Sequence, residues 1–325
     1  MDNSVAAVDG SGADPPPRPA SLVHDALFYR DEEEYLAGTV PFLRDSLKAG
    51  VPTLVAVPAR HGAWVSHELG SDADRVRFLD MTIDGCNPNR IIPAVLQAFV
   101  DEHPGQPVAI IGEPVWAGRT AAEYPACVQH EAMINVVFAG LVGTILCPYD
   151  SRSLEPEVLR DASRTHPTLI LRGTRTRSRS YTDPATVVAD FNRPLPCPAH
   201  ATAVMDFAGM DDLPRLREFV SRHASKEGLS HDRAIDLQMA ANEIATNTVR
   251  HAGAVGSVRV WAEDGHVLCD ITDSGHVEVP LAGRLAPPLT SEGGRGLLVS
   301  NYLCDLVRLY SVPGFTTVRL FVRIS

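Results

Sequence analysis

The sequence predicts two domains, an α/β domain with a mainly parallel sheet and, after it, an α+β domain. At 325 residues the chain is about twice as long as a typical domain. Before residue 171, short apolar runs alternate with segments of helical spacing, which is typical of a parallel sheet with helices on both faces. After residue 200, helical segments accompany strands of period-two alternation, which indicates helices packed on one face of a mixed sheet.

The first domain is expected between residues 21 and 171. Residues 1–20 include the run Pro15-Pro16-Pro17-Arg18-Pro19 and few large apolar side chains, so they are predicted to form a disordered tail. A strand is expected around His24 and Asp25. Further strands are expected at 54–57, 76–79, 108–111 and 144–147, with helices at 32–49, 91–102 and 123–139.

A basic, proline-rich stretch, 172–199, is predicted to be the linker to the second domain. Its arginines could bind phosphate or nucleic acid, but a solvated connector is the more common meaning of such a composition. The arginines are Arg172, Arg175, Arg177 and Arg179, and the prolines are Pro184, Pro194, Pro196 and Pro198. The second domain, 200–325, is expected to have strands at 201–207, 256–263, 266–273, 306–310 and 316–324, with helices at 213–225, 231–251 and 294–303.

The bulk composition is that of a soluble globular protein, with 45% hydrophobic and 21% charged residues. Its apolar runs are too short to cross a bilayer, and the acidic start of the chain lacks the pattern of a secretory signal, so a cytoplasmic location is expected. A net charge of −11 disfavours direct DNA binding and favours a protein or small-molecule partner. The six cysteines show no paired spacing typical of a zinc knuckle or disulfide scaffold.

Two short motifs in the second domain place oxygen ligands at useful positions. Glu243 and Asn247 are four residues apart in a predicted helix, so a carboxylate and an amide share one face and could serve a hard cation and a nucleophile. The alternative is an exposed polar stripe. Asp273 ends a predicted strand and is followed by Gly275, so its carboxylate could accept a hydrogen bond from an adenine amine. The alternative there is an ordinary turn.

A third motif, Glu292-Gly293-Gly294-Arg295-Gly296-Leu297, opens a predicted helix with three glycines. Glycines at a helix N-terminus let backbone N–H groups approach phosphates. The segment is neither a Walker A loop nor the GxGxxG of dinucleotide folds, and a flexible loop is the alternative.

Together, in order, these motifs and the closing strand that contains Gly314-Phe315-Thr316-Thr317-Val318 resemble the N box, G1 box, G2 box and terminal Thr strand of the GHKL ATPases. The resemblance covers about residues 207–325 and is closest to the anti-sigma serine kinases, which carry a His shortly after the Glu-x-x-x-Asn motif, as His251 does here. It implies a GHKL-type ATP-binding sandwich.

The resemblance also implies roles for individual residues. Asn247 would bind Mg²⁺, Glu243 would be the catalytic base that takes the proton of a substrate serine, and Asp273 would recognise adenine. Gly275 and Thr316 would complete the adenine pocket. The lid over the phosphates would consist of Gly293, Gly294, Arg295 and Gly296. His276-Val277 departs from the family pattern, where another Gly is frequent.

The expected function is that of an anti-sigma factor that binds Mg-ATP, sequesters a sigma factor and phosphorylates a serine of a STAS-type anti-anti-sigma partner. A homodimer is compatible with this function. Two alternatives stay open, a non-catalytic ATP-dependent binding module and a sensor histidine kinase. The latter needs a phospho-accepting His on a dimerising hairpin. His231 lies inside the ATP domain, and His24 lies at a distant strand.

The first domain, 22–171, resembles the MEDS sensory domain through His24–Tyr29, Pro41-Phe42-Leu43, 112–116, 131–135, 147–150 and 165–167. Its polar residues fall at predicted strand ends, where open parallel sheets bind ligands. A small-molecule pocket is therefore expected, although satisfied core polarity explains any one residue alone, and a metal site of His24, Cys147 and His166 is a further alternative. The pocket residues are His24, Tyr29, Glu113, Trp116, Glu131, Asn135 and His166.

Overall fold

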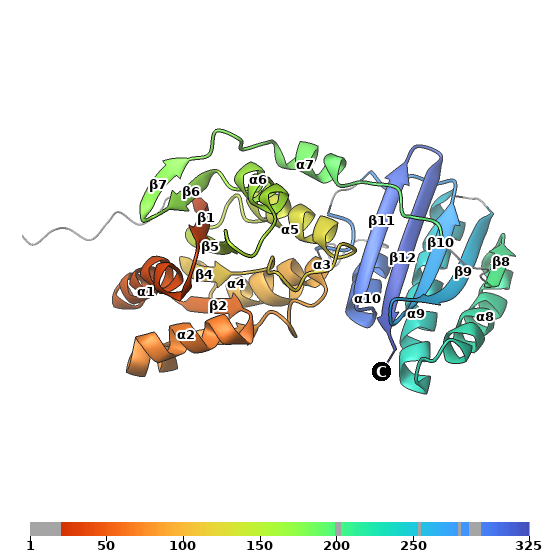
Figure 1. Cartoon of the computed structure of the whole chain (residues 1–325). Helices are drawn as coiled ribbons and strands as arrows, with labels where there is room; N and C mark the ends of the chain where they lie inside the picture. Colours follow the sequence, from red (N-terminus) through yellow and green to blue (C-terminus); the bar gives the residue numbers. More distant parts are fainter. Residues whose placement is uncertain (1–20, 199–202, 253–254, 279–280, 286–293, 325) are drawn as a thin grey trace, which may run out of the picture.

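A computed structural model describes residues 21–198, 203–252, 255–278, 281–285 and 294–324. They form two lobes side by side, connected by a segment that includes helix α7 (Figure 1). One lobe contains a seven-stranded sheet of order β3-β2-β4-β5-β1-β6-β7, and the other a five-stranded sheet of order β11-β12-β10-β9-β8. The predicted fold class, a mainly parallel α/β domain followed by an α+β domain, is confirmed.

In the first sheet all neighbouring strands are parallel except β7, which pairs antiparallel with β6. The apolar runs predicted as strands are buried because helices cover both faces; β2 and β4 are buried along their whole length. The strands are β1 (Leu22–Tyr29), β2 (Thr53–Val57), β3 (Arg77–Asp80), β4 (Val108–Gly112), β5 (Gly143–Asp150), β6 (Thr168–Leu171) and β7 (Thr174–Arg177).

The helices of this domain include short and irregular pieces. Residues 91–102, predicted as one helix, begin with a π-helical segment that contains Pro93, which cannot donate a backbone hydrogen bond. The helices are α1 (Glu32–Lys48), α2 (Ala59–Leu69), the 3₁₀ turn Gly70–Arg75, α3 (Pro88–Arg90), the π segment Ile91–Leu96, α4 (Gln97–Asp101), α5 (Tyr124–Val137), α6 (Pro156–Thr165) and α7 (Pro184–Asp190).

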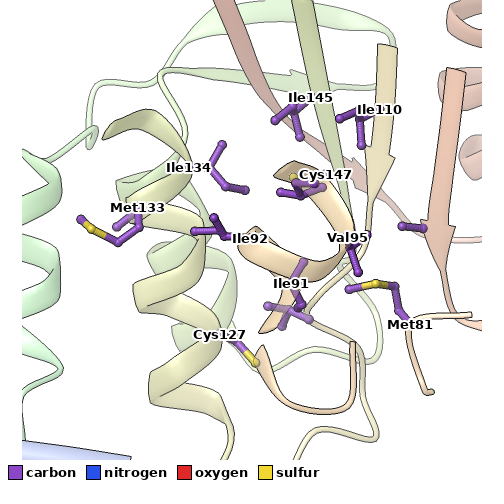
Figure 2. Packing of buried hydrophobic residues seen from close by; sticks show 14 of the residues in the cluster. Met81, Ile91, Ile92, Val95, Ile110, Cys127, Met133, Ile134, Ile145 and Cys147 are labelled. Carbon is purple, nitrogen blue, oxygen red and sulfur yellow. The ribbon is translucent and has the colours of Figure 1, made fainter. Parts of the chain in front are cut away.

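Consecutive residues of each central strand pack into different hydrophobic clusters, because side chains alternate across a sheet. One cluster lies under the π segment and α5, where Ile91, Ile92 and Ile134 surround the strand residues (Figure 2). The other lies under α1 and α2. Ala26, Leu54, Ile110 and Ile145 point to the first cluster, and Leu27, Val55, Ile111 and Leu146 point to the second.

The second sheet is antiparallel throughout, with its helices on one face (Figure 1). On the other face Arg319 forms a buried ion pair with Asp270, and its Nη2 donates to the carbonyl of Pro196 at 2.8 Å. The strands are β8 (Ala203–Phe207), β9 (Gly256–Glu263), β10 (His266–Asp273), β11 (Leu306–Val312) and β12 (Phe315–Arg323). The helices are the 3₁₀ turn Met210–Asp212, α8 (Leu213–Lys226), α9 (His231–Asn247), the π turn Thr248–Ala252 and α10 (Gly296–Leu303).

The stretch expected as the linker, 172–199, contributes structure to the first domain. Strand β7 extends the sheet, and Arg175 pairs with Asp25 at 3.0 Å. Helix α7 packs on α5 and buries Val187, and Phe191, just after α7, is buried as well.

Within the described residues no helix is long and apolar enough to cross a membrane. Residues 1–20, 199–202, 253–254, 279–280, 286–293 and 325, on which parts of the predictions fall, lie outside the described residues.

The two domains are in direct contact through buried side-chain amides. Asn87 Nδ2 donates to the carbonyl of Asn301 at 3.0 Å, and Asn89 Nδ2 donates to the carbonyl of Val307 at 2.8 Å. Asn89 Nδ2 also donates to Asn301 Oδ1 at 3.1 Å. Because Asn301 belongs to α10, the loop and turn before the π segment hold that helix directly.

A second contact joins α5 to the segment between the G1 and G2 motifs. Arg284 is buried; its Nη2 donates to Gln129 Oε1 at 2.8 Å and its Nη1 to the carbonyl of Ala126 at 3.4 Å. At the edge of the second sheet, Asn192 exchanges two hydrogen bonds with the backbone of Ser311 in β11. Polar groups of that edge strand are thereby satisfied within the chain.

Candidate ATP site and a buried polar cluster

Helix α9 and the start of α10 bring the N-box and G2-box residues together. Glu243 and Asn247 lie one turn apart in α9, and both are half-buried. A Cβ atom on Gly296, the first residue of α10, would lie 2.8 Å from Asn247 Nδ2 and 3.4 Å from Glu243 Oε2. Only glycine therefore fits here without displacing Asn247. The N-terminus of α10 therefore lies against a carboxylate and an amide.

Asp273 ends β10, as predicted, and both of its carboxylate oxygens are held. The backbone N–H of Gly275 donates to Oδ1 at 2.7 Å, and Thr248 Oγ1 donates to Oδ2 at 2.5 Å. Thr248 directly follows Asn247, so the hydroxyl ties the G1 motif to the N box. Sequence reasoning missed Thr248, although its place beside Asn247 was a usable signal.

Thr316 lies opposite Asp273 in the register of β10 and β12. Its hydroxyl donates to the carbonyl of Gly275 at 3.1 Å and lies 2.7 Å from Ser311 Oγ. Ser311 Oγ also accepts the backbone N–H of Val277 at 2.8 Å and contacts His276 Nδ1 at 3.1 Å. The loop after Asp273 is therefore anchored to β11 and β12 at the point where the sequence departs from the family pattern. Ser311 was also missed by sequence reasoning.

Of the predicted lid residues, Gly293 lies outside the described residues. Gly294 has φ +87°, in the left-handed region that favours glycine, and it is exposed. Arg295 is exposed and directly precedes α10. The described lid residues, Gly294 and Arg295, are therefore followed directly by Gly296, which lies against Glu243 and Asn247.

Of the seven residues predicted for a pocket in the first domain, four lie in one buried cluster with Cys147. Glu131 Oε2 in α5 lies 3.2 Å from His24 Nε2 in β1 and 3.4 Å from His166 Nε2, just after α6. Asn135 Oδ1, also in α5, lies 3.1 Å from His24 Nδ1. Cys147 in β5 places its Sγ 3.4 Å from His24 Nε2 and 3.6 Å from Glu131 Oε2.

Burial alone would raise the pKa of Glu131, but the facing His166 and His24 hold that pKa well below its usual range. Burial lowers the pKa of His24, and the nearby His166 acts in the same direction. Tyr149, which lies in the matching stretch 147–150 but is not among the predicted pocket residues, donates from its hydroxyl to Glu131 Oε1 at 3.0 Å.

The other predicted pocket residues have different partners. Tyr29 OH donates to Glu113 Oε1 at 3.2 Å, and His61 Nδ1 lies 2.7 Å from Glu113 Oε2. Burial raises the pKa of Glu113, while His61 opposes this shift. Trp116 is half-buried and stacks on the guanidinium of Arg119. The hydrogen bonds therefore divide the predicted pocket into separate groups, and sequence reasoning missed His61.

Comparison with known proteins agrees with this two-domain organisation. Residues 23–167 match the MEthanogen/methylotroph, DcmR Sensory domain (MEDS), and residues 208–322 match the histidine kinase-like ATPase domain. The chain is similar to the serine-protein kinase RsbW of Bacillus licheniformis, with 34% identity over 116 residues, which covers 31% of this chain and 72% of the relative.

Two solved structures align with parts of the chain. One contains the RsbU and RsbW domains of a Mycobacterium tuberculosis protein, at 20% identity over 38% of this chain and 33% of that one, with a TM-score of 0.29. The other is the flagellar accessory protein FlaH of Methanocaldococcus jannaschii, at 9% identity over 53% of this chain and 81% of that one, with a TM-score of 0.32. Neither TM-score is high enough to support an argument about the fold.

The antiparallel sheet with helices on one face, and the domain model that matches it, place the second domain among the histidine kinase-like ATPases. At 34% identity over 72% of RsbW, the chain belongs to the family of RsbW serine-protein kinases, with a MEDS domain at its N-terminal side. Membership of this family implies that the second domain binds ATP.

The first prediction concerns Asp273. Asp273→Asn replaces one carboxylate oxygen with an NH₂ group, which cannot accept a hydrogen bond. That NH₂ group would face either the N–H of Gly275 or the hydroxyl of Thr248. We expect ATP affinity to fall by on the order of 1.5–3 kcal/mol, because a hydrogen bond to a charged acceptor is lost. Calorimetry with ATP and GTP measures the loss and the base preference. Asp206→Asn, an exposed change on edge strand β8, is the matched control. Equal affinity in wild type and Asp273→Asn would exclude adenine recognition by this carboxylate.

Proposed function

We propose that this protein is an anti-sigma regulator that binds Mg-ATP, sequesters a sigma factor and phosphorylates a serine of an anti-anti-sigma partner. The observation that supports this most directly is the convergence of Glu243, Asn247 and the N-terminus of α10 on one site. Asp273 is tied to that site through Thr248. Kinship with a serine-protein kinase supplies the reaction class.

Each side chain has a role that its position supports. The amide oxygen of Asn247 is a hard ligand suited to Mg²⁺, and the N–H groups at the start of α10 favour phosphate oxygens. Bound Mg²⁺ supplies charge neutralisation on the phosphates during transfer. Glu243, one turn away in α9, would accept the hydroxyl proton of the incoming serine. Asp273 accepts from the adenine amine while Thr248 and Gly275 hold its orientation.

A second candidate is a binding module in which ATP only orders the lid. It is favoured by the anchoring of the segments around the lid: Val277 is tied to Ser311, and Arg284 to α5 of the first domain. Such a lid would support sequestration of the partner without phosphate transfer. The two candidates differ in whether Glu243 affects a chemical step.

The second prediction separates these candidates. Glu243→Gln keeps the shape of the side chain against Gly296 but removes the base, so we expect ATP binding to persist and transfer to serine to slow roughly 10²–10⁴-fold. Asn247→Ala removes the metal ligand and is expected to abolish the Mg²⁺ dependence of ATP affinity. The measurements are transfer from labelled ATP to a co-purified STAS-type partner and calorimetry with and without Mg²⁺. If wild type transfers no phosphate, Glu243→Gln sequesters the sigma factor normally with ATP present and Asn247→Ala does not, the binding-module function holds instead.

We propose further that the first domain controls the second through their direct contacts. Asn87 and Asn89 hold α10 by Asn301, and α10 begins at Gly296, against Glu243 and Asn247. A shift in the first domain would therefore displace the helix that forms one wall of the ATP site. Control in this sense requires that the state of one domain change the free energy of binding at the other.

The third prediction tests this contact with Asn89→Ala. The substitution leaves the buried carbonyl of Val307 without the donor from Asn89, at a cost of about 1–3 kcal/mol, and it removes one of the two donors to Asn301 Oδ1. We expect changed ATP or sigma-factor affinity in the full-length protein, with each domain still folded by circular dichroism. Gln97→Ala is the control, since that amide bonds to Asp101 within α4. Identical affinities for wild type, Asn89→Ala and Gln97→Ala would argue against control through α10.

A further inference from the structure

We propose that His24, Glu131, Cys147 and His166 bind a divalent transition-metal ion, with Zn²⁺ the best match, inside the first domain. The side chains come from β1, α5, β5 and the residue after α6. All four are at most 2% exposed. One ligand atom from each lies within 4.8 Å of the others.

Four of the six separations between these atoms are close to those around a tetrahedral ion, and the other two are at most 4.8 Å. With Zn–N and Zn–O near 2.1 Å and Zn–S near 2.3 Å, tetrahedral ligands lie about 3.3–3.8 Å from one another. Glu131 Oε2 lies 3.2 Å from His24 Nε2 and 3.4 Å from His166 Nε2. Cys147 Sγ lies 3.4 Å from His24 Nε2 and 3.6 Å from Glu131 Oε2. These four separations are within about 0.2 Å of the corresponding tetrahedral edges.

Both imidazoles are oriented from outside the cluster. Asn135 Nδ2 donates to the carbonyl of Thr165 at 2.8 Å, so its Oδ1 is the atom that accepts from His24 Nδ1 at 3.1 Å. His166 Nδ1 donates to the carbonyl of Ala162 at 2.8 Å. With Nδ1 protonated, each neutral ring directs the Nε2 lone pair to the centre of the cluster. Metal-binding histidines in proteins are held by outer partners in the same way.

The carboxylate of Glu131 is arranged similarly. Oε1 accepts the hydroxyl of Tyr149 at 3.0 Å, which leaves Oε2 for the centre. Three of the four ligands thus have an outer hydrogen-bond partner that fixes the atom they present. Such outer partners are a common feature of metal sites.

His166 Nε2 supplies an independent indication of an absent ligand. It is buried and has no hydrogen-bond partner among the described residues, although Glu131 Oε2 is 3.4 Å away. A buried polar atom without a partner is costly. Two imidazole lone pairs and a carboxylate oxygen that converge in the core repel one another unless a positive charge lies between them. A metal ion satisfies all of them at once.

The donor types select the class of metal. Two imidazoles, a thiolate and a carboxylate favour Zn²⁺ and similar ions over Mg²⁺ or Ca²⁺, which prefer oxygen ligands alone. Binding would release the thiol proton of Cys147 to solvent, because the thiolate is the ligand.

The experiment uses the purified full-length protein, stripped with a chelator and titrated with Zn²⁺ against a chromophoric competitor, then with Co²⁺. We expect one ion per chain and a thiolate-to-Co²⁺ charge-transfer absorption. Cys147→Ser should lose that absorption. Its Zn²⁺ affinity should fall by at least roughly 10–100-fold, which is the loss that follows from changing an outer hydrogen-bond partner of a metal ligand. Cys127→Ala, at another buried thiol of the same domain, is the matched control and should bind as wild type does.

His166→Gln provides a second test should Cys147→Ser fail to fold, and circular dichroism identifies that case. Zn²⁺ should also raise the melting temperature of the stripped wild-type protein. A wild-type protein that binds Zn²⁺ no more tightly than Cys147→Ser, shows no charge-transfer band with Co²⁺ and melts unchanged would overturn the proposal. The cluster would then be a hydrogen-bonded ion network that serves packing alone. ATP binding by the second domain is measured separately and does not depend on the outcome.

Discussion

The burial of the Glu131 carboxylate is the constraint around which the first domain is arranged. Removing an ion of this size from water costs several kcal/mol even in real proteins, so the core must return that energy through facing groups. The hydroxyl of Tyr149 does so at 3.0 Å, and the imidazoles of His24 and His166 lie 3.2 and 3.4 Å from the other carboxylate oxygen, where they stabilise it when protonated or through a shared metal ion. They come from β1, from β5 and from the end of α6. The order of the sheet, in which β5 and β1 are neighbours under α5, brings these groups together around the carboxylate.

Helix α5 links this cluster to the ATP-binding domain. Glu131 and Asn135 face the cluster, while Gln129 and the carbonyl of Ala126 receive the guanidinium of Arg284 from the other domain. Packed helices shift as units because protein interiors are dense, so a change at the cluster has a physical path to the segment before the lid. A second path runs from Asn87 and Asn89 to α10. Both paths end near the same face of the ATP site, which makes the direct domain contact a better candidate for transmission than the connector alone.

The ATP site depends on two residues that are adjacent in the chain. Asn247 and Thr248 are adjacent, and the π turn that starts at Thr248 places its hydroxyl on the carboxylate of Asp273. The N-box and G1-box motifs are thereby held together, and Gly296 allows α10 to approach them closely. On the far side, Thr316 and Ser311 anchor the loop after Asp273. The same loop carries His276 and Val277, so the departure from the family pattern coincides with a tether to β11.

Sequence alone determined the fold class and the order of the ATP motifs. The spacing of apolar residues indicates which side chains are buried, and this predicts the helices and strands. Glu243 and Asn247 share a face because they are four residues apart in a helix. The sequence could not show that β7 and α7 belong to the first domain, because the short, polar segment 174–177 has no distinctive strand pattern. It could not show that Thr248 holds Asp273, because a single hydroxyl residue carries no recognisable signal. Only the tertiary structure decided that Cys147 and Glu131 join His24 and His166 while Tyr29 and Glu113 pair with His61. The physical reason is that these side chains are distant in sequence, and their convergence depends on which strands are neighbours and which faces the helices cover.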